Sequence, residues 1–173
     1  LIEALAVNAG LGATIWLLIK GRLRTYMIFK LQPPAGTTGR DDLIQVSDLI
    51  RGSPRVDLLN IELRVVAANF ECGKYVRGTG TKKRTVSFEE PVRAVVLYRQ
   101  SVDRLPKGQD IRKLLDGSFT FEPMYRALYP PCMVSSAHGM KVGWEIQLIH
   151  SEFVDQELQG PGSIFRYEEF VNV

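Results

Sequence analysis

The first nineteen residues of the chain form an apolar run that contains one acid, Glu3, and no basic residue. A run of this kind needs a dry environment, because removing apolar surface from water is the main favourable term in folding. As a helix it would be about 28 Å long, close to the ~30 Å hydrocarbon layer of a bilayer. Three placements are therefore open: a membrane span, a helix docked on a membrane or a partner, and a buried helix of the domain.

The residues in and after this run favour burial. Glu3 and Asn8 are polar, and two glycines lower the helix propensity of the run. A strand is expected to begin at Leu23, so no linker is left for the chain to leave a membrane. No basic region precedes the run, which argues against a signal peptide. We predict an apolar helix over residues 1–19, buried against a sheet or another subunit, with docking as the second placement and a span as the third.

If the run docks instead, its C-terminal end would make the contact, because Trp16 can anchor at a membrane interface and the basic flank suits the cytosolic side. The contacting residues would be Ile15, Trp16, Leu17, Leu18 and Ile19. The flank that follows at once adds three cations able to bind phosphates, namely Lys20, Arg22 and Arg24.

The chain has 173 residues, of which 45% are hydrophobic and 24% charged, as expected for one globular domain. Its two cysteines, Cys72 and Cys132, cannot form a disulfide framework. They are typical of reduced thiols, which indicates an intracellular location, on the cytosolic side and peripheral to a membrane if the chain binds one.

The net charge of +3 hides an uneven distribution. Residues 20–113 carry 19 Lys and Arg against 10 Asp and Glu, whereas residues 114–173 carry 3 against 8. A basic body suits an anionic partner, either a nucleic acid or nucleoprotein or an anionic membrane. A basic body with an acidic end also suits head-to-tail self-association, so we expect a homo-oligomer.

Alternating and helical patterns predict an α+β fold with a mainly antiparallel sheet of about five to seven strands, the N-terminal helix and two or three short helices. We expect strands at 22–32, 56–69, 85–88, 91–99, 119–121 and 141–151, with 91–99 central because both its faces are apolar. We expect helical segments at 41–51, 110–116 and 122–128, a turn at 71–74, a loop at 78–84 and a docked tail at 165–173. The predicted core is Leu59, Ile61, Leu63, Val65, Val96, Trp144, Ile146 and Leu148.

The best candidate site is the basic loop, in which cations alternate with glycines and threonines whose N–H and hydroxyl groups can bind phosphate oxygens. Its cations are Lys74, Arg77, Lys82, Lys83 and Arg84. The Gly78-Thr79-Gly80 segment lacks the spacing of the known phosphate-binding loops. The loop therefore predicts non-specific phosphate binding, or else only an exposed hairpin tip that charge keeps soluble.

Catalytic and metal-binding patterns are weak. His138 and His150 are twelve residues apart, and neither lies at ligand spacing from a cysteine. A pair of Cys132 and His138 has no supporting spacing, and neighbouring carboxylates such as Glu89 and Glu90 would point to opposite faces of a strand. We expect no metal, no cofactor, no small-molecule substrate and no enzymatic activity.

Three functions are consistent with these features. The first is a structural or assembly domain that binds an anionic membrane or a ribonucleoprotein through its basic face and self-associates. In size, charge and apolar content the chain is similar to the small basic α+β matrix proteins of enveloped RNA viruses, a likeness of class without a shared motif, which implies a place in the virion. The second is a β-sheet adaptor for protein partners, and the third is a membrane-anchored ligand sensor.

Overall fold

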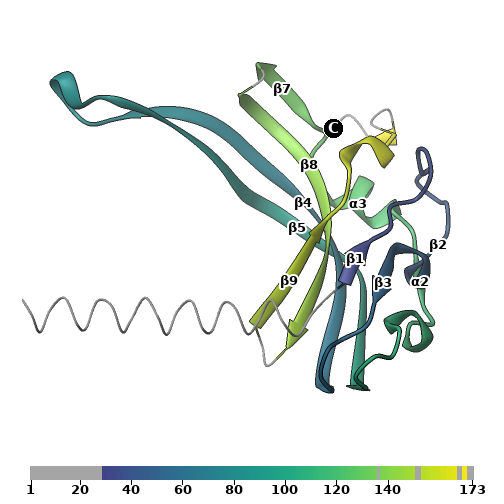
Figure 1. Ribbon diagram of the computed structural model, residues 1–173. Helices are drawn as coiled ribbons and strands as arrows, with labels where there is room; N and C mark the ends of the chain where they lie inside the picture. Colours follow the sequence, from purple (N-terminus) through teal and green to yellow (C-terminus); the bar gives the residue numbers. More distant parts are fainter. Residues whose placement is uncertain (1–28, 136, 151–152, 167–168, 171–173) are drawn as a thin grey trace, which may run out of the picture.

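The computed structural model describes residues 29–135, 137–150, 153–166 and 169–170 (Figure 1). The helix predicted for residues 1–19, with the contact segment Ile15 to Ile19, lies outside the described residues. So do the basic flank of Lys20, Arg22 and Arg24 and most of the strand predicted for 22–32. Within the described ranges no helix is both long enough and apolar enough to cross a membrane.

A five-stranded antiparallel sheet forms the centre of the fold (Figure 1). Its strands are β4 (Leu58–Arg77), β5 (Arg84–Leu105), β7 (Cys132–Ser135), β8 (His138–His150) and β9 (Phe153–Gln159). The order is β5-β4-β8, and both β7 and β9 pair with β8 on the side away from β4. The mainly antiparallel sheet of the predicted fold class is confirmed.

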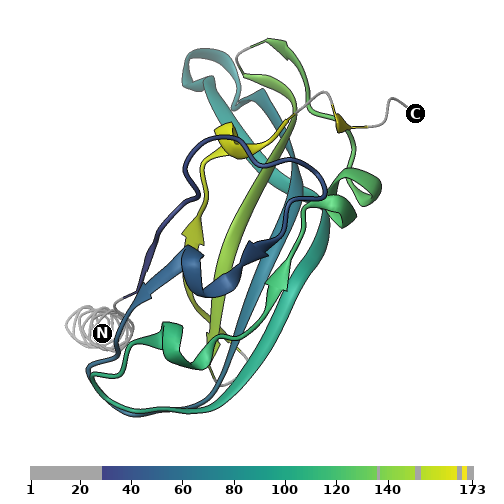
Figure 2. The same cartoon turned by 90° about the vertical axis from the view of Figure 1, so that its right-hand side faces the viewer.

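Short elements cover one face of this sheet (Figure 2). Two small antiparallel pairs join β1 (Phe29–Leu31) to β3 (Ile50–Gly52) and β2 (Ile44–Gln45) to β6 (Ser118–Phe119). The helices in this layer are α2 (Val46–Leu49) and α3 (Glu122–Ala127). Three 3₁₀ helices, Gly80–Lys82, Ile111–Leu114 and Gly162–Ile164, complete the described elements. We call the covered side of the sheet the core face and the opposite side the outer face.

The core lies between the sheet and this layer. Phe121 is fully buried at its centre and makes edge-to-face ring contacts with Phe119, Trp144 and Phe165 at centroid distances of 5.5, 5.8 and 5.0 Å. The Trp144 indole N–H donates to the Pro161 carbonyl oxygen at 3.2 Å, so its one polar group is satisfied. Aromatic packing therefore joins the sheet to the C-terminal segment.

Six of the eight predicted core residues are buried: Ile61, Leu63, Val65, Trp144, Ile146 and Leu148. Leu59 and Val96 were predicted wrongly, since they are 54% and 52% exposed. Asn60, with a φ of 53°, breaks the in–out alternation beside Leu59. A β-bulge beside Val96 shifts the register of β5 and turns that side chain to the outer face.

Several element boundaries differ from the sequence prediction. There is no turn at 71–74, because β4 continues through these residues to Arg77. The segments 85–88 and 91–99 form one strand, β5. Among the described strands β5 pairs with β4 alone, so it lies at an edge of the sheet and is not central as predicted. Its register shifts near Pro91, at a residue that cannot donate to the ladder.

The helix predicted over 41–51 contracts to the four residues of α2, because Ile44 pairs with Phe119 before it and Ile50 pairs with Leu31 after it. The helix predicted over 122–128 is confirmed as α3, with Pro123 in its first turn. The helical turn predicted at 110–116 is a 3₁₀ helix. The strand predicted at 119–121 overlaps β6 only at Phe119, because Phe121 already precedes α3.

The described residues of the tail predicted at 165–173 dock on the domain. Phe165 and Phe170 are buried, and the Phe170 ring packs against Tyr125 of α3 at 4.7 Å. A parallel bridge joins Phe165 to Thr38. The strands β7 and β9 were not predicted.

Candidate functional site

The two longest strands extend beyond the rest of the sheet. β4 pairs with β8 only as far as Cys72 and Gly139, whereas its pairing with β5 continues to Arg77 and Arg84. Residues 73–88 therefore form a two-stranded antiparallel ribbon that projects from the sheet (Figure 1). We call this segment the ribbon.

A glycine-dependent turn closes the ribbon at Gly78–Lys83. Gly78 has a φ of 101°, and a Cβ atom there would lie 2.4 Å from the Lys82 carbonyl oxygen. Gly80 also has a positive φ, 58°, which favours glycine. The turn at this position was visible in the sequence as the predicted loop at 78–84.

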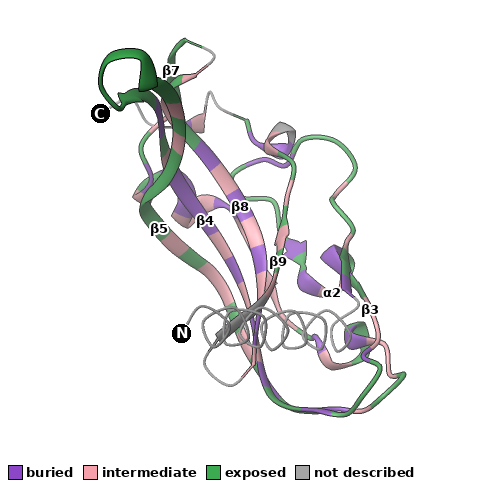
Figure 3. Cartoon of the chain, turned by 60° about the vertical axis from the view of Figure 1, so that its left-hand side comes forward, coloured by how far each residue is buried: buried purple, intermediate pink, exposed green. Residues whose placement is uncertain are grey.

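The ribbon carries five basic side chains and no acidic one. These are the five cations of the predicted basic loop, Lys74, Arg77, Lys82, Lys83 and Arg84, and all five are exposed (Figure 3). Among the residues that the structure describes, none of these side chains takes part in an ion pair. Arg77 and Arg84 lie directly opposite each other, an arrangement of like charges that costs stability.

The two faces of the ribbon differ. Directly opposed residues share a face, so the arginine pair lies on the same face as the pairs Tyr75–Val86 and Gly73–Phe88. The Tyr75 and Phe88 rings lie 6.3 Å apart, and Tyr75 is 48% exposed. This face therefore offers an accessible aromatic ring next to two guanidinium groups.

His138 holds the base of the ribbon. The Lys74 backbone N–H donates to His138 Nε2 at 3.2 Å, and His138 Nδ1 lies 3.3 Å from the Ser135 hydroxyl oxygen. The Ser135 oxygen also accepts from the backbone N–H groups of Ala137 and His138. The imidazole thus ties the β7–β8 turn to β4.

The cysteines form no functional pair. Cys72 lies on β4 and Cys132 on β7, with β8 between them. Two strand spacings are about 9.5 Å, whereas a disulfide needs Cα atoms within about 7 Å. Both thiols are free. His138 is engaged with Lys74 and Ser135, and His150 is half-buried opposite Ile61.

A groove of about 470 Å³ lies on the outer face of the sheet. Its floor is apolar and made of small or flat side chains: Val66, Ala68, Phe70, Pro91, Ala94 and Gly143. Its polar rim includes Glu89, Lys141, Glu145, Gln147, Glu157 and Gln159. This groove was not predicted from the sequence, because four separate strands contribute to it and only their pairing brings the residues together.

One ion pair crosses the groove. The Lys141 ammonium lies 2.9 Å from Glu89, and this hydrogen bond raises the pKa of Lys141. Glu145 accepts from the Gln147 side-chain amide at 2.6 Å. Neither Glu145 nor Glu157 takes part in an ion pair with any described residue.

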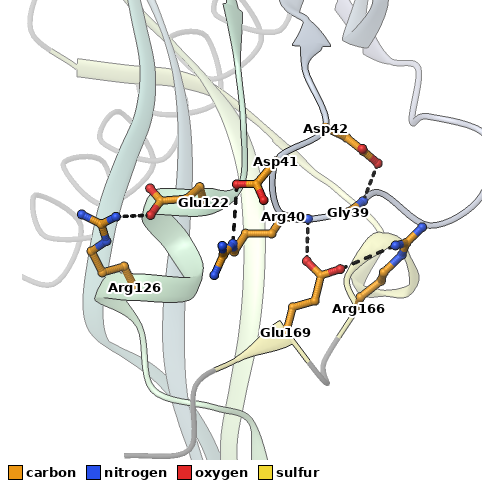
Figure 4. A network of polar contacts seen from close by, with 8 residues as sticks. All are labelled: Gly39, Arg40, Asp41, Asp42, Glu122, Arg126, Arg166 and Glu169. Carbon is orange, nitrogen blue, oxygen red and sulfur yellow. Dashed lines mark hydrogen bonds and ion pairs between the residues drawn. The ribbon is translucent and has the colours of Figure 1, made fainter.

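A second polar cluster is structural (Figure 4). The Gly39 N–H donates to Asp42 at 2.7 Å, and the Arg40 N–H donates to Glu169 at 2.5 Å. Arg166 lies 3.6 Å from the same Glu169 carboxylate. These contacts fasten the loop before β2 to the C-terminal segment.

The described part of the chain holds no cluster of three or more His, Cys, Asp or Glu side chains that could bind a metal ion. A comparison with models of known protein families gives no match, and a comparison with curated proteins gives none either. The basic ribbon and the outer-face groove are therefore the features from which a function can be argued.

Proposed function

We propose that this protein is a non-enzymatic structural domain that binds single-stranded nucleic acid, as in a ribonucleoprotein, through the ribbon. One observation carries the proposal. The sixteen residues of the ribbon include five exposed cations and no acidic residue. Cations on a narrow projecting element can follow a phosphate backbone, and counterion release then supplies most of the affinity.

The aromatic face of the ribbon favours nucleic acid over an anionic membrane. Tyr75 lies two residues before Arg77 on the same face, so a base can stack on the ring while its phosphates meet the arginine pair. Residues 78–83 at the tip are glycines, threonines and lysines, none of which would insert into acyl chains. At its tip the ribbon would therefore hold a membrane by charge alone.

The first test replaces Lys82, Lys83 and Arg84 with alanine and measures binding to oligouridylate as a function of salt. Losing three phosphate contacts should lower the log–log salt slope by about 2, because each contact on a single strand contributes ~0.7. The matched control replaces Arg55, Lys107 and Lys113, which are exposed cations outside the ribbon, and should keep both affinity and slope.

The second test separates the two kinds of anionic partner. Tyr75→Ala should weaken oligouridylate binding by about 5- to 150-fold, the range of one lost base stack, and leave binding to phosphatidylserine vesicles unchanged. A triple ribbon variant that loses vesicle binding but keeps oligouridylate binding would assign the ribbon to membranes. If the triple ribbon variant binds both oligouridylate and the vesicles as the parent does, the ribbon tip is only a soluble turn.

A further inference from the structure

The outer-face groove has an apolar floor that no described element covers. Ala68, Ala94 and Gly143 keep the floor low, so a side chain from outside can reach the sheet. Val96, beside Ala94 on β5, is 52% exposed on the same face. An open apolar floor with a polar rim is typical of a surface that binds another protein segment.

The charges on the rim of the groove indicate which kind of segment could bind there. Three carboxylates line the groove against one cation, and that cation, Lys141, is already paired with Glu89. Glu145 and Glu157 are left facing the groove without a cation from the described residues. The occupant should therefore carry apolar and basic side chains together.

The ribbon has this composition. Its exposed apolar side chains, Tyr75 at 48% and Val76 at 62%, lie on opposite faces, and cations flank both. Arg77 and Arg84 have no ion-pair partner among the described residues, and their mutual repulsion would fall beside carboxylates. The ribbon and the groove thus match in both apolar character and charge.

The ribbon cannot fill the groove of its own chain. Phe70, Glu89 and Pro91 line the groove at the base of the ribbon, and the two paired strands lead away from that base (Figure 1). We propose that the ribbon of one copy docks in the outer-face groove of a second copy. The contact joins two different surfaces of the chain, so it either occurs twice in a two-fold symmetric dimer or continues from copy to copy into longer assemblies.

The test is a charge exchange followed by sedimentation velocity of the full chain at low salt. One variant carries Glu145→Lys and Glu157→Lys, and the other carries Arg77→Glu and Arg84→Glu. Each should raise the dissociation constant of self-association at least tenfold. A chain that carries all four substitutions should self-associate again, because the charges are exchanged between groove and ribbon.

Matched controls reverse charges elsewhere on the surface. Asp103→Lys with Asp116→Lys, and Arg55→Glu with Lys107→Glu, alter exposed residues outside both features and should leave self-association unchanged. The groove variant should also keep its oligouridylate affinity at concentrations at which it is monomeric, so this test is independent of the proposed function.

Three results would overturn the docking proposal. The first is a parent chain that stays monomeric at low salt. The second is a four-substitution chain that stays monomeric when each two-substitution variant does. The third is a melting temperature that, at protein concentrations where the parent is still monomeric, falls with Glu145→Lys and Glu157→Lys but not with the control pair, because the groove would then hold a segment of its own chain.

Discussion

Glu62 connects neighbouring strands on the outer face. Burial raises the pKa of this carboxyl, but hydrogen bonds from Arg99, at 2.7 Å, and from Arg64 outweigh burial and lower it below its ordinary value of 4.5. A lowered pKa in the folded state means that the carboxylate contributes to the free energy of unfolding above pH 4.5. This contribution is lost as the pH falls through the lowered pKa.

Glu62→Gln should therefore lower the free energy of unfolding by about 1 kcal/mol at pH 7, because a charged acceptor of two arginine hydrogen bonds is lost. The difference from the parent should shrink as the pH falls from 5 towards 3. Urea unfolding at several pH values measures both effects. Glu90→Gln, at an exposed carboxylate, is the control, and an equal loss at every pH would contradict this account.

At the scale of elements, the ribbon is long because β4 and β5 continue to pair beyond the point where the pairing of β4 with β8 ends. Lys74 lies just past the last residue of β4 that pairs with β8, so its N–H faces an open side of the ribbon. No described strand pairs with Lys74 on this side, and His138 Nε2 accepts the Lys74 N–H in place of a strand carbonyl oxygen. One imidazole thereby fixes where the ribbon leaves the sheet.

His138→Ala should speed hydrogen exchange of the Lys74 amide about fivefold, which corresponds to the ~1 kcal/mol of a typical hydrogen bond. Hydrogen-exchange mass spectrometry with peptides ending near residue 74 measures this change. The amides of Leu63 and Val65 in the same strand are the internal reference and should not change. Unchanged exchange at Lys74 would show that the imidazole does not hold the ribbon.

At the scale of the whole molecule, most of the buried apolar packing lies on the core face. Trp144 on this face packs against Phe121 and contacts Gly160, where a Cβ atom would lie 1.9 Å from the indole ring. Val96 faces the other way and is half exposed. Trp144 and Val96 are both apolar residues in strands, but we expect them to contribute very differently to the free energy of unfolding.

Trp144→Ala should cost ~3–5 kcal/mol and Leu63→Ala ~2–5 kcal/mol, because both leave a cavity in a fully packed core. Val96→Ala should stay within about 0.5 kcal/mol of the parent. Denaturant unfolding of the three variants measures these differences. A loss at Val96 as large as the loss at Trp144 would mean that the outer face is also buried.

The sequence alone determined the parts of this protein that depend on neighbours along the chain. Alternation placed strands at 56–69 and 141–151, Pro123 marked the first turn of α3, and composition located the basic loop. These signals are local, because a strand repeats every two residues and a short helix begins at a recognisable residue.

Only the tertiary structure decided where strands end, which strand lies at an edge and which face is open. Glu71 to Lys74 resemble a turn in sequence but continue β4, because β5 pairs with them across the hairpin. The exposure of Val96 and the existence of the groove depend on register between strands far apart in the chain. Pairing across such separations fixes these features, and no local periodicity records it.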